Sequence, residues 1–263
     1  NVSSNTGYGV DIRRMHNVTI SDGCSSSPHT DVGARILTHT AQNYVPGIDV
    51  IQIEHVVTHA GYIIANCLGM PLQALDATLM TIQETPDGCH VTVWGDGVVV
   101  VRRRDTQQLE YTSISFSLNA PEYASYIPNT ERHKAFRAMG GGTKTLTCSD
   151  GTVYVSPPPM KLSNPDELVF QSSYSGTFSR KEYDLVLVMS DGVESFQKKD
   201  ATRYQPIPLA EVLAQVTDFK LYSDGFIQRR MHRFLTKFCL ESNWIHTDDV
   251  TVGGIYMKSQ TEE

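Results

Sequence analysis

A series of strand patterns with no helix pattern between them most limits what this chain can fold into. Residues 76–84, 90–97 and 98–104 are rich in β-branched residues, and the turn sequences "PDG" (86–88) and "GDG" (95–97) separate them. Consecutive strands joined by short turns must run antiparallel, because parallel neighbours need a long crossover connection. The sequence therefore predicts an antiparallel meander at the centre of the fold.

Further patterns surround this meander. Strand patterns occupy 16–21, 110–119, 143–156, 183–190 and 248–257. Apolar residues recur at helical spacing in about 30–44, 48–68, 208–219 and 224–241. Thr30 and Asp224 are the predicted N-caps of the first and last helices. Residues 157–182, which contain three consecutive prolines and many Ser residues, are predicted to form a loop or flap.

The order of these patterns decides the fold class. One strand precedes two helices, many strands follow, and two helices and a strand close the chain. This order predicts an α+β fold with antiparallel sheets and helices on the outside. It does not alternate strand and helix, and the sequence has neither a GxGxxG motif nor a phosphate-binding P-loop. Rossmann and TIM-barrel folds are therefore excluded.

Composition limits the partners and the compartment. The formal charge of −7 argues against binding to a nucleic-acid backbone, and we interpret the basic run 102–104 as a solvated strand edge or turn. The five cysteines contain no CxxC pair and are odd in number, so neither a disulfide framework nor a zinc site is indicated. No apolar run is long enough to span a bilayer, and no signal-peptide pattern opens the chain. We expect a cytoplasmic protein without a membrane partner.

Four aspartates stand at the ends of predicted strands, each beside a glycine or a second aspartate: Asp22, Asp96, Asp191 and Asp248. Carboxylates that converge above a sheet offer the hard oxygen ligands that Mg²⁺ and Mn²⁺ prefer. A neighbouring glycine lets the backbone turn sharply, and its carbonyl can also bind a cation. The alternative remains open, because Asp-Gly is a common turn dipeptide and any one of these pairs can be a turn alone.

Five segments together resemble the metal-dependent protein phosphatases of the PP2C or PPM family, in their bacterial variety. The segments are "ISDGCSSSPHTDVGAR", "LDATLMTI", "VWGDGVVVV", "LVLVMSDGVESF" and "TDDVTVGGIYM". The resemblance runs from about residue 16 to 257 in a constant order. It implies a single domain over 1–263, built as a four-layer α-β-β-α sandwich in which helix pairs flank two central antiparallel sheets.

The same resemblance implies a two-metal site at one edge of the sandwich. Asp22 would bridge both cations, and the Gly23 carbonyl would bind one of them. Asp191 and Asp248 would bind the other cation. Asp248 is preferred to its neighbour Asp249, because the family motif places the ligand before a "[DN]-[IVM]-[TS]" step. In a separate position, Asp96 would be an accessory ligand for a third metal.

The resemblance also implies an activity. A metal-bound water would attack phosphoserine or phosphothreonine directly, with Mg²⁺ or Mn²⁺ as cofactor and no phosphoenzyme. The substrate would be a phosphorylated protein, the target of a partner Ser/Thr kinase in a signalling system. Two alternatives stay open: a pseudophosphatase that acts as a regulatory binding module, and a small-molecule phosphomonoesterase.

The chain departs from the family pattern in two places. An acidic pair preceded by a phosphate-binding arginine is expected roughly twenty residues before Asp22, which falls near residue 2, so we expect the first strand to precede this numbering. Arg13 and Arg14 lie too close to Asp22 for that role and are assigned to the surface. Cys24 stands where many members have His, and no base is placed near it to make it a nucleophile. The phosphate-binding residue and the general acid are therefore unassigned.

Overall fold

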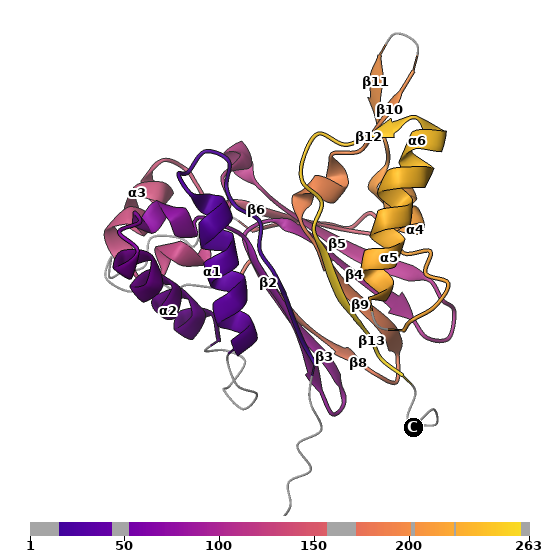
Figure 1. The fold of residues 1–263 in the computed structure, drawn as a ribbon, viewed down its shortest axis with the longest axis horizontal. Coiled ribbons are helices and arrows are strands. Elements are labelled where there is room, and N and C mark those ends of the chain that lie inside the picture. Colours follow the sequence, from indigo (N-terminus) through magenta and orange to yellow (C-terminus); the bar gives the residue numbers. More distant parts are fainter. Residues whose placement is uncertain (1–15, 44–52, 157–171, 201–202, 224, 259–263) are drawn as a thin grey trace, which may run out of the picture.

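Two antiparallel sheets pack face to face, and helices cover the outer face of each (Figure 1). The computed structural model describes residues 16–43, 53–156, 172–200, 203–223 and 225–258. This architecture confirms the predicted α+β class and the sandwich of two central sheets between helices. No helix in these described ranges is long and apolar enough to cross a membrane.

The first sheet has four strands in the order β1-β2-β3-β8. Their bounds are Asn17–Ile20, Leu79–Thr85, Gly88–Trp94 and Tyr174–Ser179. Strands β2 and β3 form the predicted hairpin, in which Leu79 pairs with Trp94. Strand β8 lies within 157–182, where the sequence predicted only a loop. That prediction was wrong for 174–179, and its first part, 157–171, lies outside the described residues.

The second sheet has six strands in the order β13-β9-β4-β5-β6-β7. Their bounds are Val252–Tyr256, Tyr183–Met189, Gly97–Arg103, Leu109–Phe116, Lys144–Cys148 and Val153–Ser156. All pairs are antiparallel, and β9 lies between β13 and β4. A small third sheet, with the order β11-β10-β12, consists of Tyr204–Pro206, Gln197–Lys199 and Trp244–Ile245.

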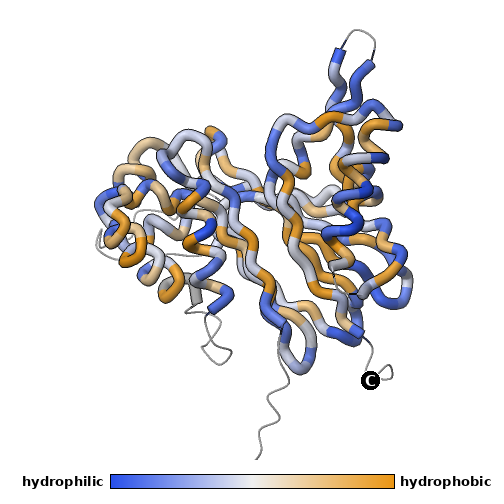
Figure 2. The backbone as a smooth tube through the Cα atoms, viewed as in Figure 1, coloured by the Kyte–Doolittle hydropathy of each residue, from blue (hydrophilic) through white to orange (hydrophobic). Residues whose placement is uncertain are grey.

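The apolar run of β9 is buried on both faces, because alternate side chains of a strand point to opposite sides. Leu185 and Leu187 pack with the helices, whereas Val186 and Val188 pack between the two sheets. Strand β4 divides its valines in the same way. Figure 2 shows this concentration of hydrophobic residues along the central strands. The continuous apolar run therefore marks the strand with a covering layer on each side.

Helices form the two outer layers. Those beside the four-stranded sheet are α1 (Thr30–Asn43), α2 (Ile53–Cys67) and α3 (Thr130–Ala138). Those beside the six-stranded sheet are α4 (Leu209–Val216), α5 (Phe226–Arg233) and α6 (Cys239–Ser242), and the π-helical turn Phe234–Phe238 joins the last two. Helices α1 and α2 match the two predicted near the start of the chain, and α4 to α6 match the two predicted near its end. The predicted cap Asp224 lies outside the described residues.

The basic run is not a surface patch, since each of its side chains is paired within the fold. Arg102 forms a bidentate ion pair with Asp184, with distances of 2.8 and 3.0 Å, and its side chain is only 12% exposed. Arg103 pairs with Glu110, and Arg104 donates to three backbone carbonyls. The expected turn is right for Arg104, but Arg102 and Arg103 end β4, a strand in the interior of the sheet, and the expectation of solvation was wrong for Arg102.

Candidate functional site

Asp22 lies two residues beyond the end of β1, and its backbone is hydrogen-bonded to Thr78, which immediately precedes the neighbouring strand β2. The Asp22 N–H donates to Thr78 Oγ1 at 2.9 Å, and the Thr78 N–H donates to the Asp22 carbonyl at 2.8 Å. Gly23 and Ala77 form an antiparallel bridge of the non-hydrogen-bonded kind. The Gly23 carbonyl therefore points away from Ala77 and is available to a ligand.

The loop after Gly23 is packed tightly against the start of α1. A Cβ on Gly23 would lie 2.8 Å from Thr30 atoms, so only glycine fits. Thr30 was predicted to cap the helix, but its hydroxyl donates to the Cys24 carbonyl at 2.9 Å. The contact fastens the loop to the helix instead. The position of Gly23 is thus set by close packing on both sides.

Asp191 begins a short 3-10 turn immediately beyond β9. The neighbouring Gly192 was predicted to permit a sharp turn, but it is not among the glycines with positive φ. A Cβ on Gly192 would lie 2.0 Å from the Asp249 carbonyl oxygen. Glycine is required here because the segment before β13 crosses directly over it. This crossing brings the two predicted metal-binding segments together.

Two serines fasten the same crossing. Ser190 Oγ donates to the Asp249 carbonyl and accepts from the Thr251 N–H, both at 3.0 Å. Ser195 Oγ accepts from the Asp248 N–H at 3.3 Å. Both serines belong to "VMSDGVES", so the motif that supplies Asp191 also supplies the groups that hold Asp248 nearby.

Asp96 lies in the turn between β3 and β4, between two glycines in the left-handed region. Gly95 has a φ of +89° and Gly97 a φ of +132°. Here the predicted role of the glycines as turn residues is confirmed, since L side chains rarely adopt these angles. A Cβ on Gly97 would also lie 2.5 Å from the Met189 carbonyl. Asp96 is thereby held close to the end of β9 that leads into Asp191.

The electrostatics shows that these carboxylates share one region of space. Burial, then Asp191 and Asp248, raise the pKa of Asp22 from 3.8 to about 6. Burial, Asp191 and Asp22 raise the pKa of Asp96 to about 7. Burial and Asp248 raise the pKa of Asp191 as well. Like charges this close repel one another, and cations are the natural compensation.

Glu194 is an additional carboxylate that sequence reasoning missed. Its Oε1 accepts a hydrogen bond from Ser113 Oγ at 2.7 Å. Burial and the charge of Asp191 raise its pKa. Glu194 could have been considered from the sequence, because it lies three residues beyond Asp191 in the same motif. The motif alone does not show in which direction the turn points the Glu194 side chain.

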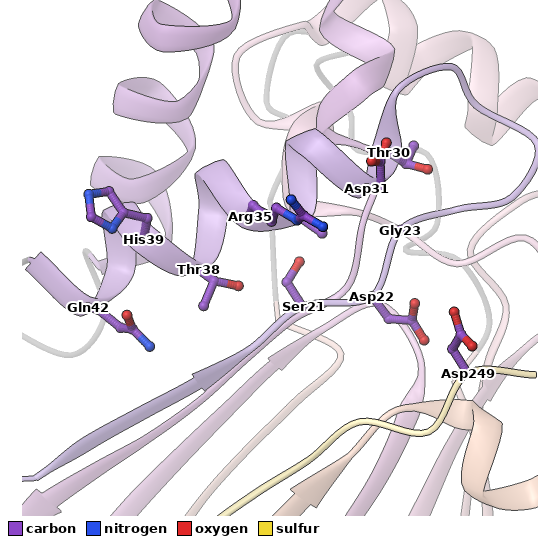
Figure 3. A pocket seen from close by; sticks show the side chains of 11 residues that line it. Ser21, Asp22, Gly23, Thr30, Asp31, Arg35, Thr38, His39, Gln42 and Asp249 are labelled. Carbon is purple, nitrogen blue, oxygen red and sulfur yellow. The ribbon is translucent and has the colours of Figure 1, made fainter.

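An open cavity of about 440 Å³ adjoins this acidic cluster. Asp22, Gly23 and Asp249 line one side, and polar residues of α1 line the other, including Arg35 and His39 (Figure 3). The sequence analysis missed the α1 residues. Asp31, Arg35 and His39 recur every four residues, a spacing that places them on one face of the helix.

The structure does not single out one of the two neighbouring aspartates, Asp248 and Asp249, as the metal ligand. Both Asp248 and Asp249 are exposed, and Asp249 lines the cavity together with Asp22. Asp248 acts more strongly than Asp249 on the pKa of Asp22, and it also raises that of Asp191. The assignment of Asp248 as the ligand therefore stays a prediction.

The donor set fits a hard divalent cation by its chemistry, since it consists of carboxylate oxygens whose mutual repulsion a cation would relieve. Among the described residues, however, no group of three or more His, Cys, Asp or Glu side chains is close enough to hold one ion. The carboxylate oxygens face the same region, but they are not close enough together to bind one ion in this conformation. The predicted ligands Asp22, Asp191 and Asp248, and the accessory Asp96, are thus neighbours rather than a preformed cage.

Cys24 lies beside the acidic cluster in a network of hydroxyl groups. Its Sγ is 3.0 Å from Ser26 Oγ. Burial opposes ionisation, but hydrogen bonds with Ser26 and Tyr123 lower the pKa of the Cys24 thiol overall. No side chain in its described surroundings is assigned as a base, so the expectation that it is not a nucleophile stays a prediction.

A buried ion pair that the sequence analysis did not anticipate supports the loop after Asp22. Asp76 is 2% exposed and forms a bidentate pair with Arg132 of α3, and it accepts from Ser125 Oγ at 2.6 Å. It also accepts from Ser27 Oγ at 2.8 Å, and its backbone carbonyl accepts from the Cys24 N–H. This aspartate therefore positions the candidate site without lining it.

Comparisons with known proteins gave a match to one family and a match among solved structures. The sequence profile described as Protein phosphatase 2C matches residues 10–236. Among solved structures, the chain is similar to the Mycobacterium tuberculosis serine/threonine phosphatase PstP/Ppp, with 13% sequence identity and a TM-score of 0.44. That alignment covers 94% of this chain and 89% of the other. No sequence among the curated proteins matches.

Proposed function

This chain belongs to the protein phosphatase 2C family, and on that premise we propose that it is a metal-dependent protein serine/threonine phosphatase. The observation that carries the proposal is the convergence of Asp22, Asp96 and Asp191 from three strand ends on one acidic region. Burial, and then repulsion among these groups, raises their pKa values, a pattern that is common at functional sites.

In the proposed site Asp22, the Gly23 carbonyl, Asp191 and Asp248 hold two Mg²⁺ or Mn²⁺ ions, and Asp96 is the accessory ligand for a third. When bound, such cations make water a better nucleophile and neutralise phosphoryl oxygens. The chain's own part is positional. Strand β9 and the serines that tie it to the segment before β13 keep the carboxylates on a rigid frame.

Arg35 is the side chain best placed to meet the phosphorylated substrate. It lies on α1 and lines the same cavity as Asp22. A guanidinium suits a phosphoryl group because it can donate two parallel hydrogen bonds. Arg35→Ala is therefore expected to raise KM more than it lowers kcat, whereas loss of a metal ligand lowers kcat.

The proposed substrate is a phosphoserine or phosphothreonine of a protein that a partner kinase modifies, with the cytoplasm as the proposed location. The test is hydrolysis of a phosphothreonine peptide and of p-nitrophenyl phosphate, each with Mn²⁺, with Mg²⁺ and with EDTA. We expect turnover that requires a divalent cation and ceases with EDTA. Turnover that survives chelation contradicts the metal mechanism, and a preference for small esters favours a small-molecule phosphomonoesterase.

A pseudophosphatase is the second candidate, and one observation favours it. Although these aspartates share one region, no three His, Cys, Asp or Glu side chains of the described residues are close enough to hold a single ion, as expected of an incomplete metal site. The two candidates differ in one measurement. If Mn²⁺ raises the melting temperature through binding but supports no turnover of either substrate, the chain is a binding module of the same fold.

A further inference from the structure

A second pocket, of about 250 Å³, lies between the end of α4 and the helix α5. Its lining comes from the connecting segment and from one face of α5: Asp218, Phe219, Lys220, Leu221, Phe226, Arg229, Arg230 and Arg233. It shares no residue with the acidic cavity beside Asp22.

The charge of this pocket is opposite to that of the whole chain. Among the described residues its lining contains four cations, Lys220, Arg229, Arg230 and Arg233, and one anion, Asp218, a formal excess of three positive charges. The chain as a whole carries −7. A local excess of this sign and size in an acidic protein concentrates anions at one place.

Arg230 is the most unfavourably placed of these cations, because its charged side chain is only 10% exposed to solvent. Both Nε and an Nη atom of Arg230 donate to the Gln215 carbonyl near the end of α4, which leaves the guanidinium fixed at the pocket. Burial lowers the pKa of Arg230, and the charge of Arg233 lowers it further. An anion in the pocket would offset both effects.

Asp218 does not cancel the positive charge. It accepts a hydrogen bond from Lys220 at 2.6 Å and lies 3.7 Å from Arg230. Arg233 adds a further cation on the same face of α5, one turn after Arg229, which Ser223 orients through a hydrogen bond of 2.9 Å. The excess is thus concentrated on α5.

The remaining walls are apolar. Phe219 and Phe226 meet edge to face with their ring centroids 4.8 Å apart, and Leu221 is 71% exposed beside them. Cations next to exposed apolar surface suit a ligand that has an anionic head and an organic body. Arginine in particular matches the geometry of phosphate oxygens.

We propose that the pocket between α4 and α5 binds the phosphate group of a phosphorylated ligand. The ligand chemistry is a phosphate dianion, either free or carried on a peptide side chain. The apolar wall favours the second source, because it can contact the peptide around the phosphorylated residue.

The site is separate from the candidate catalytic centre. Tyr222, within the segment that lines the pocket, accepts a hydrogen bond from Arg102 and stacks on Tyr256. Arg102 and Tyr256 both pair with Leu185, near the start of β9. Asp191 follows the other end of this seven-residue strand, which spans roughly 20 Å.

The test measures binding in the absence of catalysis. The probes are a phosphoserine peptide, its unphosphorylated twin and inorganic phosphate, titrated calorimetrically into the Asp191→Asn protein with EDTA present. In that background Arg233→Gln removes one exposed cation from the pocket. Arg203→Gln, the same change on the exposed β10–β11 hairpin, is the matched control.

We expect the phosphoserine peptide to bind, and Arg233→Gln to weaken its binding about tenfold, as the loss of one charge-assisted contact predicts. Arg203→Gln should leave binding unchanged, and added salt should weaken it. Inorganic phosphate that binds equally tightly, with the same dependence on Arg233, assigns the site to free phosphate. No binding of either phosphate probe, equal binding of the unphosphorylated twin, or equal affinity of the Arg233→Gln protein overturns the proposal, provided that thermal melting shows the variants folded.

Discussion

Replacement of Asp22 by Asn is expected to stabilise the metal-free protein at neutral pH. Burial and the charges of Asp191 and Asp248 raise the pKa of Asp22 from 3.8 to about 6. Between these two values the folded protein binds more protons at this group than the unfolded chain does. The metal-free wild type therefore loses stability as the pH rises from about 4 to about 6. Asparagine keeps the shape of the side chain and removes this loss.

The magnitude follows from the shift. A change of one pKa unit corresponds to about 1.4 kcal/mol, so a shift from 3.8 to about 6 corresponds to roughly 3 kcal/mol. This is an upper bound, because Asp22 is only half-buried, so solvent screens part of the interaction, and because it shares its repulsion with carboxylates that titrate together with it. A gain of about 2 kcal/mol would raise the melting temperature by roughly 4–8 °C in a domain of this size.

The assay is thermal melting of the wild type and of Asp22→Asn from pH 4 to 8, with EDTA and then with Mn²⁺. The two proteins should differ little near pH 4, diverge as the pH rises to about 6, and keep a constant difference above that pH. Mn²⁺ should stabilise the wild type more than the variant. Asp105→Asn, an exposed turn residue remote from the cluster, is the control. A variant that is less stable than the wild type at pH 7 without metal would refute the electrostatic reasoning.

Four other substitutions test the remaining steps. Asp191→Asn should lower turnover more than about 10²-fold with the fold intact by circular dichroism, and Asp249→Asn should cost far less; the reverse order in a steady-state phosphatase assay would show that the register of the closing segment is wrong. Gly192→Ala should destabilise the protein by about 1–3 kcal/mol in urea unfolding, because its Cβ would meet the Asp249 carbonyl, and unchanged stability would mean that this crossing is loose. Arg132→Met leaves Asp76 buried without its cation, so we expect a loss of about 3–5 kcal/mol in the same assay, and a neutral result would show that the pair is not needed.

Most strands were predictable because their pattern is local. The valines of β4 and the apolar run of β9 indicate, within a few residues, an extended strand that is buried on both faces. Helix α3 was missed, since "TERHKAFRA" has no apolar stripe. It is held instead by ion pairs with distant residues, Arg132 with Asp76 and Arg137 with Glu122. The one local signal is the N-cap Asn129, whose side chain accepts from the Arg132 N–H, and a cap without an apolar stripe does not identify a helix.

Strand β8 was missed for a related reason. "YSGTFS" reads as a polar, glycine-containing loop, yet it pairs with β3 along its length. At the edge of a sheet one side of a strand stays in water, so the sequence need not be apolar. Residues 174–179 form a strand because they hydrogen-bond to β3, a segment that is distant in the sequence.

The strand ends, the aspartates that follow them and the family resemblance could all be predicted from the amino-acid sequence, because they depend on short motifs in a fixed order. The tertiary structure decided which of these groups meet. The crossing at Gly192 brings Asp191 and Asp248 together, and α1 brings Arg35 to the cavity beside Asp22. It also decided the pKa values, since burial and through-space repulsion act between segments that are far apart in the chain and have no trace in any one of them.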